Sequence, residues 1–314
     1  MVSEQIDKRK AINRHHKTKM IVSLVFLIVV VIAAIFGIVY FTLQQTRSEI
    51  LLPETEENSA AEEPEPEPEI VLPGRIDFQP VVDEWAKSAG GTHSVLVYDL
   101  DRDEMVGEYD AERDYNTASL YKLFVVYEGY RRVQSGEWKA DAPAGATGYT
   151  IAQCLDKAIR ESHSPCAETL WAKIGHDELD EIIERDFEIH DSKISSLVST
   201  PNDILKMMRI FYEHSDITDE SLLAQMKDSF LNQPATEYNW RQGLPSGFAE
   251  ANVYNKVGWD YNPEGRYWNI YHDAAIIEFP EQNRHYIIVV MTNRVPFEKI
   301  RALGAAIETE FNKY

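Results

Sequence analysis

Apolar residues follow two kinds of pattern along the chain, and the first is an unbroken run near the N-terminus. Residues 20–43 contain no charged side chain. A helix of that length spans about 36 Å, enough to cross a bilayer hydrocarbon core of about 30 Å. A cleaved signal peptide has a shorter apolar core, of about 7–15 residues, followed by a small-residue cleavage site. We therefore expect residues 20–43 to form an uncleaved transmembrane anchor.

The charges around this run predict its orientation. Residues 1–19 contain six Lys and Arg side chains, and positively charged flanks stay in the cytoplasm. We therefore expect a cytoplasmic tail over residues 1–19, a single-pass anchor in the cell membrane, and the rest of the chain outside the cell. Residues 44–75 are rich in Glu and Pro. Proline and like charges keep such a chain extended, which predicts a stalk with no core of its own.

Residues 76–314 carry the second pattern, in which apolar positions recur at helix or strand spacing. Helices are expected over 77–87, 119–134, 151–174, 201–214 and 295–312. Strands are expected over 93–99, 104–109, 270–279 and 285–292. This order predicts an α+β domain. Its antiparallel sheet would be built from both ends of the domain and flanked by helices, with an all-helical lobe inserted between.

Composition and charge remove several classes of function. The net charge of −21, from 52 acidic and 31 basic residues, disfavours binding to nucleic acid. Two cysteines are too few for a disulfide framework or a Cys-rich zinc site. Whether Cys154 and Cys166 pair is left open, and two buried thiols are favoured. The nine histidines form no metal-binding motif and there is no phosphate-binding glycine loop, so no metal or organic cofactor is expected.

One short motif, Ser119-Leu120-Tyr121-Lys122, opens an apolar predicted helix. Residues three apart share a helix face, so the Lys122 amine can lie beside the Ser119 hydroxyl. Serine is a weak nucleophile without an adjacent base, and a partly desolvated lysine can have its pKa lowered enough to act as one. The helix N-terminus also favours negative charge that develops nearby. Taken alone, the motif is weak evidence for catalysis, and a helix cap is the favoured interpretation.

Two further segments follow in order, Ser162-His163-Ser164 in the helical lobe and Lys256-Val257-Gly258 near the late strands. Together with Ser119 and Lys122, the set resembles the Ser-x-x-Lys, Ser-Asp-Asn and Lys-Thr-Gly motifs of the class A β-lactamases and penicillin-binding proteins. Order and spacing agree over most of residues 76–314. Three more segments are similar to segments of that family: Asn116-Thr117-Ala118, Thr200-Pro201-x-Asp203 and Arg241-x-Gly243-Leu244-Pro245-x-Gly247.

The resemblance implies a role for each matched residue. Ser119 would attack the carbonyl and become acylated, and Lys122 would take part in removing its proton. Ser162 would relay a proton to the leaving amine, with help from Lys256, which would also attract a substrate carboxylate. The backbone N–H groups of Ser119 and Trp259 would form the oxyanion hole. The substrate-binding residues implied are Ser164, Gly258, Trp259 and Arg266.

The motifs depart from the family pattern at three positions. Ser164 replaces the usual Asn, and Val257 replaces the usual Thr or Ser, so an amide and a hydroxyl are absent. His163 replaces the usual Asp. It is either a participant in the reaction or a histidine on the helix surface. A slipped interpretation, Ser164-Pro165-Cys166, resembles the Ser-x-Cys variant of some D,D-peptidases, but Ser162 aligns better with the helix that follows.

The largest departure is the loop that carries the deacylating base. Class A β-lactamases use a Glu in a Glu-x-x-Leu-Asn pattern on an omega loop, and residues 175–200 hold no such pattern. Glu184, Asp186 and Glu188 lie there, where we expect them to be solvated. Without a positioned base, attack of water on the acyl-enzyme should be slow. This favours a slow hydrolase or an acyl transferase of the D,D-peptidase kind.

The resemblance therefore implies a bacterial, membrane-anchored, extracellular serine acyl hydrolase. Its substrates would be small-molecule β-lactams or D-alanyl peptidoglycan peptides. Ser164 and Val257 motivate an alternative, a catalytically weak or inactive protein of the same fold that binds cell-wall ligands. A signalling or adhesion ectodomain is a third hypothesis, which rests on the anchor and stalk alone.

Overall fold

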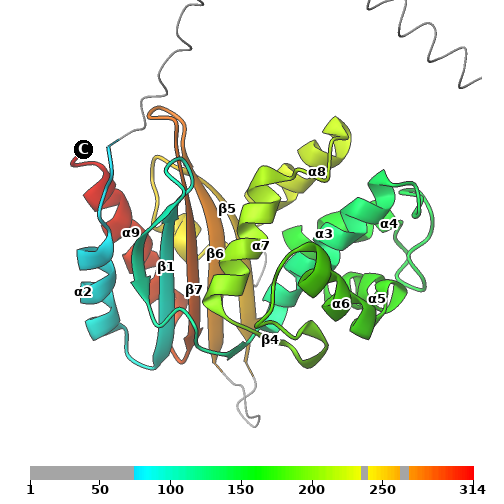
Figure 1. The fold of residues 1–314 in the computed structure, drawn as a ribbon, viewed down its shortest axis with the longest axis horizontal. Coiled ribbons are helices and arrows are strands. Elements are labelled where there is room, and N and C mark those ends of the chain that lie inside the picture. Colours follow the sequence, from blue (N-terminus) through cyan, green and yellow to red (C-terminus); the bar gives the residue numbers. More distant parts are fainter. Residues whose placement is uncertain (1–73, 235–239, 262–268) are drawn as a thin grey trace, which may run out of the picture. The chain divides into compact units, whose positions relative to one another are not determined.

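A five-stranded antiparallel sheet lies at the centre of the part of the chain that the structure describes. This computed structural model describes residues 74–234, 240–261 and 269–314. The strands lie in the order β2-β1-β7-β6-β5, between two groups of helices (Figure 1). Their bounds are β1 Thr92–Asp99, β2 Glu104–Tyr109, β5 Asn252–Asp260, β6 Ile270–Phe279 and β7 Arg284–Asn293. Because β1 pairs with β7 along its whole length, the sheet joins both ends of the domain, as predicted.

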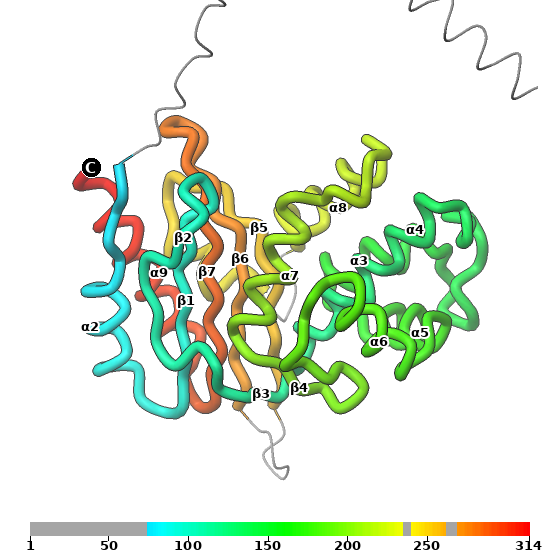
Figure 2. Tube along the Cα trace, in the orientation of Figure 1, coloured from blue at the N-terminus to red at the C-terminus, as the bar shows by residue number. Residues whose placement is uncertain are grey.

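Helices pack on both faces of this sheet. One face carries α2 Gln79–Ala89 and α9 Phe297–Phe311. The other face carries α7 and α8, and the remaining helices form a lobe beside them (Figure 2). The helices on this side are α3 Tyr121–Gln134, α4 Ile151–Arg160, α5 Ser164–Ile174, α6 His176–Asp186, α7 Pro201–Glu213 and α8 Glu220–Leu231. Short connecting elements are β3 Tyr115–Asn116, β4 Val198–Ser199, and the 3₁₀ turns η1 Ala118–Leu120, η2 Ile194–Ser196 and η3 Leu244–Ser246.

Alternation along the strands separates two hydrophobic cores. Val95 and Val97 belong to the cluster under α2 and α9, whereas Leu96 and Tyr98 belong to the larger cluster on the side of the helical lobe. Successive side chains of a strand point to opposite faces, so one strand supplies both cores. β1 is buried along almost its whole length for this reason.

The predicted helix 151–174 is two helices, α4 and α5, broken at residues 161–163. Pro165 lies in the first turn of α5. A continuous helix is unfavourable there, because proline has no N–H to donate and its ring clashes with the carbonyl four residues earlier. His163 is the N-cap of α5, and Ser162 adopts a left-handed conformation with φ 54°. The apolar spacing that continues across the break hid it from the sequence pattern. Helices α6 and α8 were not predicted.

The two cysteines form a disulfide between α4 and α5, so the expectation of two free thiols was wrong. Twelve residues separate Cys154 from Cys166, a distance of about 18 Å on one continuous helix. The break at residues 161–163 turns the chain back, and the two Cα atoms lie 4.8 Å apart. The pairing depends on a turn that the sequence pattern did not predict.

The predicted tail, the anchor over residues 20–43 and all but the end of the stalk lie outside the described residues, as does Arg266. Within the described segments, no helix has the length and apolar character needed to span a membrane.

Candidate active site

The three predicted motifs meet at the amine of Lys122. Its Nζ lies 3.2 Å from Ser119 Oγ, 3.2 Å from Ser162 Oγ and 3.0 Å from Ser164 Oγ. It also donates to the Ser162 carbonyl over 2.6 Å. On the far side of Ser162, the Lys256 Nζ lies 3.0 Å from the same Oγ. Three hydroxyls and two amines, supplied by η1, α3, the α4–α5 connection, the start of α5 and β5, therefore form one hydrogen-bonded cluster.

Backbone contacts fix the turn that carries Ser119. Ser119 lies in the 3₁₀ turn η1, directly before α3. The Thr117 N–H donates to the Leu197 carbonyl over 2.8 Å, and the Ala118 N–H donates to Asn116 Oδ1 over 2.9 Å. Ala118 has a φ of 42°, a conformation that non-glycine residues rarely adopt and that is found mainly at functional sites. The turn is therefore held in a shape that it would not take by itself.

β5 approaches this turn closely because residue 258 is glycine. A Cβ built on Gly258 would lie 2.8 Å from the Thr117 carbonyl oxygen and 3.0 Å from the His272 ring. Any larger residue would push the strand away from the turn. Gly258 thus brings Lys256, two residues before it and on the same face of the strand, towards the serines.

Burial acts on the pKa values of both lysines. Lys122 is completely buried, and this desolvation lowers its pKa to about 8, while the Glu168 carboxylate acts in the opposite direction. Desolvation also lowers the pKa of Lys256 well below its usual value, and the nearby Lys122 charge lowers it further. A lysine with a pKa of about 8 holds roughly a tenth of its population as free amine at pH 7. Lys122 can therefore accept a proton from Ser119 near neutral pH.

The motif residues that depart from the family pattern have well-defined places. The Ser164 hydroxyl contacts Lys122 even without the reach of an Asn side chain. The Val257 side chain packs in the cluster under α2 and α9, with 1% of its surface exposed. Trp259 is half-buried, with its ring 6.0 Å from that of Trp240.

The contacts of the α4–α5 connection bear on the two alternatives that the sequence left open there. His163 Nδ1 accepts from the Cys166 N–H over 3.2 Å, so this side chain caps α5. Ser162 contacts both lysines, whereas Cys166 is held in the disulfide. The geometry therefore favours Ser162 over the Ser-x-Cys interpretation.

Three residues that sequence analysis missed support the cluster. His272 on β6 contacts the Asn116 carbonyl through Nε2 and accepts from the Thr292 N–H through Nδ1, each over 2.8 Å. Burial lowers the pKa of His272 to about 4, so the ring is neutral near pH 7. No local pattern marked this residue, because its partners lie far away in sequence.

The second missed residue is Asp273, which lies beneath β5. Its carboxylate accepts from Asn255 Nδ2 and from the Leu244 N–H, each over 2.8 Å. Burial raises the pKa of Asp273 to about 7, and the carboxylate acts on Lys256 by raising its pKa. The Gly-Leu-Pro segment noted in the sequence therefore wraps a buried carboxyl group behind the catalytic strand.

The third missed residue is Glu168 on α5, whose Oε1 accepts a hydrogen bond from Tyr121 Oη over 2.5 Å. Tyr121 lies between Ser119 and Lys122 in the chain, and its ring centroid is 5.7 Å from the Lys122 Nζ. The sequence offered one signal for Glu168: it follows Ser164 by four residues, which places both side chains on the same face of α5.

The segment examined for an omega-loop base contains α6 and a short turn. Asp186 forms ion pairs with Arg131 and Arg185, and Glu184 and Glu188 are exposed. Within the described residues, no hydrogen bond or ion pair joins these carboxylates to the serine–lysine cluster.

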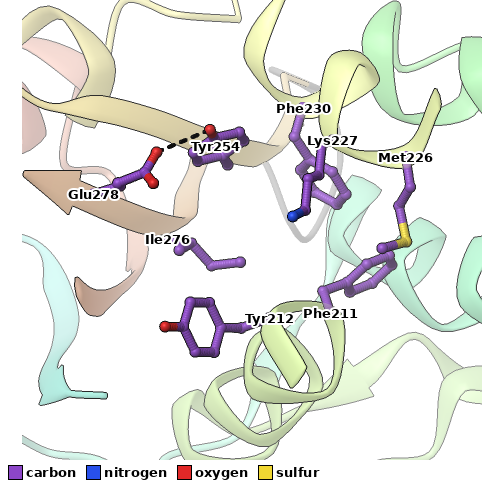
Figure 3. A pocket seen from close by; sticks show the side chains of 8 residues that line it. All are labelled: Phe211, Tyr212, Met226, Lys227, Phe230, Tyr254, Ile276 and Glu278. Atoms are coloured by element: carbon purple, nitrogen blue, oxygen red, sulfur yellow. Dashed lines mark hydrogen bonds between the residues drawn. The ribbon is translucent and has the colours of Figure 1, made fainter. Parts of the chain in front are cut away.

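A separate small pocket of about 80 Å³, open to solvent, lies between α7, α8 and the sheet (Figure 3). Aromatic rings of Phe211, Tyr212, Phe230 and Tyr254 surround it, with Lys227 and Glu278 at its edge. None of the predicted catalytic residues lines it. Within the described segments no group of acidic, His or Cys side chains is arranged to hold a metal ion.

Comparisons with known proteins agree with this geometry. The model of the beta-lactamase enzyme family matches residues 77–311. A class A beta-lactamase from Bacteroides cellulosilyticus has 16% identity and a TM-score of 0.64, covering 77% of this chain and all of its own. PBP-A has 14% identity and a TM-score of 0.62, covering 78% of this chain and all of its own.

A beta-lactamase from Xanthomonas campestris pv. campestris gives a third comparison, with 13% identity and a TM-score of 0.62. The match covers 74% of this chain and 96% of that one. No curated protein matches the chain significantly. At these identities the likeness to solved structures concerns the fold.

Proposed function

The chain belongs to the beta-lactamase enzyme family, and on that premise we propose that it is an active-site-serine acyl hydrolase that works through an acyl-enzyme on Ser119. The observation that carries the proposal is the position of the Lys122 amine, 3.2 Å from Ser119 Oγ and within reach of two more hydroxyls. A buried lysine beside a serine is the arrangement that activates this nucleophile. A helix cap would need no such convergence.

In the proposed reaction, the free amine of Lys122 accepts the proton of Ser119 while Oγ attacks the substrate carbonyl. The Ser162 hydroxyl then gives its proton to the leaving nitrogen as the carbonyl–nitrogen bond breaks. Ser162 recovers a proton from one of the two amines that flank it, at 3.2 Å and 3.0 Å. Since every proton donor is within hydrogen-bond distance of the next, no large movement is needed for the relay.

We propose β-lactams or D-alanyl peptidoglycan peptides as the substrates, because both present the acyl group that this chemistry attacks. Gly258 and Trp259 would lie along the substrate on β5, and Ser164 would border it from α5. Arg266 stays a predicted carboxylate-binding residue. The expected anchor over residues 20–43 would hold the domain outside the cell membrane, near cell-wall peptides.

The experiment is to incubate the full-length chain in detergent with a penicillin and follow its intact mass over time. We expect a mass gain equal to one penicillin, absent from Ser119→Ala. A matched control is Ser135→Ala, which removes a hydroxyl at the end of α3, away from the cluster. If wild type gains no mass, or if Ser119→Ala gains as much, the acyl-enzyme proposal fails. Binding of penicillin without a covalent adduct would then support the alternative, a protein of this fold that only binds cell-wall ligands.

A further inference from the structure

One face of α5 is directed at the start of α3. Ser164, Glu168 and Trp171 are spaced by four and three residues and therefore share this face. The Ser164 hydroxyl contacts the Lys122 amine at 3.0 Å, and Glu168 accepts from the Tyr121 hydroxyl over 2.5 Å. The Trp171 ring packs on the Tyr121 ring, with the centroids 5.1 Å apart. All three residues thus face the segment that carries the nucleophile and its base.

Glu168 combines exposure with a position beside the catalytic cluster. It is an exposed residue, so water has access to its carboxylate. Four residues along a helix rise by about 6 Å, which is the separation along α5 between Glu168 and the residue that contacts Lys122. The Glu168 charge acts directly on the Lys122 amine.

The hydrogen bond from Tyr121 holds the carboxylate in place. It occupies Oε1, so Oε2 can still accept a proton. The indole N–H of Trp171, three residues after Glu168 on α5, is buried and has no hydrogen-bond partner among the described residues. A buried donor of this kind is commonly satisfied by an ordered water. Ordered water next to Glu168 is therefore consistent with the polar groups present.

We propose that Glu168, held by Tyr121, is the general base that activates the water which hydrolyses the Ser119 acyl-enzyme. The proposal rests on the proposed function, since it needs an acyl group on Ser119. In the step, Glu168 takes one proton from water as the water oxygen bonds to the ester carbonyl carbon. The bond from that carbon to Ser119 Oγ then breaks, and the proton on Glu168 passes through the Lys122 amine to the Ser119 oxygen. This restores the Ser119 hydroxyl, the free amine of Lys122 and the Glu168 carboxylate.

This role compensates for the segment between α5 and α7. The carboxylates of α6 pair with arginines, accept hydrogen bonds from Ser195 in the case of Asp180, or are exposed. A base on α5 would supply the deacylating carboxylate from a rigid helix in place of a loop. This role also gives a function to the hydroxyl of Tyr121, in the middle of the nucleophile motif: it holds the Glu168 carboxylate.

The test separates formation of the adduct from its loss. The full-length chain is acylated with penicillin, excess ligand is removed, and the intact mass is followed as the adduct disappears. Glu168→Gln keeps an acceptor for Tyr121 but cannot take up a proton. We expect its adduct to persist about 100-fold longer or more than that of wild type, the size typical of a general base. The matched control is Glu184→Gln, an exposed position on α6, which should lose its adduct at the wild-type rate.

Each other outcome overturns the proposal in a distinguishable way. If the Glu168→Gln adduct is lost as fast as that of wild type, Glu168 is not the base, and the acyl-enzyme proposal stands. If the wild-type adduct itself never disappears, Glu168 activates no water, and the protein behaves as a penicillin-binding protein. If wild type forms no adduct, both proposals fail together.

Discussion

The turn that carries Ser119 and the connection that carries Ser162 lie in the same cluster but are tied to the rest of the domain differently. A main-chain bond to a distant element, from Thr117 to the Leu197 carbonyl, helps to fix the Ser119 turn. The main-chain bonds of the Ser162 connection reach back only to Lys157 in α4. Its bonds to distant elements come from side chains, namely the Lys122 amine on its carbonyl and the Trp240 indole on Glu161. The disulfide Cys154–Cys166 closes it from behind.

The difference shows which contacts hold each part of the site in position. The nucleophile is held in a strained shape by a main-chain bond, by the Asn116 side chain and by the neutral His272 ring, and none of these changes its protonation near neutral pH. The proton relay depends on a lysine whose charge changes near neutral pH and on a covalent crosslink. We call the turn that carries Ser119 the nucleophile half of the site, and the connection that carries Ser162, with Lys122, the relay half. We expect these two halves to respond differently to substitution, reduction and pH, and the experiments below run from the largest expected effect to the smallest.

Removal of the amine that both halves share should have the largest effect. Lys122→Met fills a similar volume but leaves Ser119 without a base and the Ser162 carbonyl without its donor. We expect the rate of acylation by penicillin to fall by about 10²–10⁴-fold, measured from the mass gain over time. The control is Lys227→Met, an exposed lysine beside the separate small pocket. A rate within threefold of wild type would show that Lys122 is not the base.

Reduction of the disulfide should loosen the relay half. The chain contains two cysteines in all, so reduction has a single target. A crosslink that closes a loop of about this length contributes about 3 kcal/mol to the free energy of unfolding. We expect denaturant unfolding of the reduced chain to show a loss of that size. An unchanged unfolding midpoint after complete reduction, verified by mass, would contradict the crosslinked geometry.

A methyl group at residue 258 should disturb the nucleophile half. In Gly258→Ala the new Cβ would lie 2.8 Å from the Thr117 carbonyl, so β5 or the turn must shift. Such overpacking costs about 1–3 kcal/mol, and we expect a lower melting temperature together with slower acylation. Gly74→Ala is the matched control, because its Cβ would meet no atom within 4 Å. Equal behaviour of the two variants would show that the close approach is not needed.

The pH dependence of acylation should give the smallest effect. Because the free amine of Lys122 is the proposed base and its pKa is about 8, the rate should rise with pH and level off above about 8. This predicts a rate at pH 7 of roughly one tenth of the plateau. Glu168 raises the pKa of Lys122, so Glu168→Gln should move this limb to lower pH. A flat profile between pH 6 and 9 would exclude Lys122 as the titrating base.

The sequence by itself predicted most elements of the domain, though not β5, α6 or α8, and it named the residues of the candidate cluster. β-rich composition next to turn signals located β2 and β6 to the residue, and the order of elements predicted a sheet made from both ends of the domain. The spacing of Ser119 and Lys122 placed hydroxyl and amine on one helix face, since that geometry is local. The three motifs were found for the same reason, because each is a short run of adjacent residues.

Only the tertiary structure decided how these runs are connected and supported. The break before α5 reversed the chain direction and paired Cys154 with Cys166, where apolar spacing alone predicted one continuous helix. His272 and Glu168 acquired their roles from partners 156 and 47 residues away. The pKa of Lys122 follows from complete burial, which is a property of the packed domain. Local periodicity carries no information on contacts of this range, so they became visible only when the chain was folded.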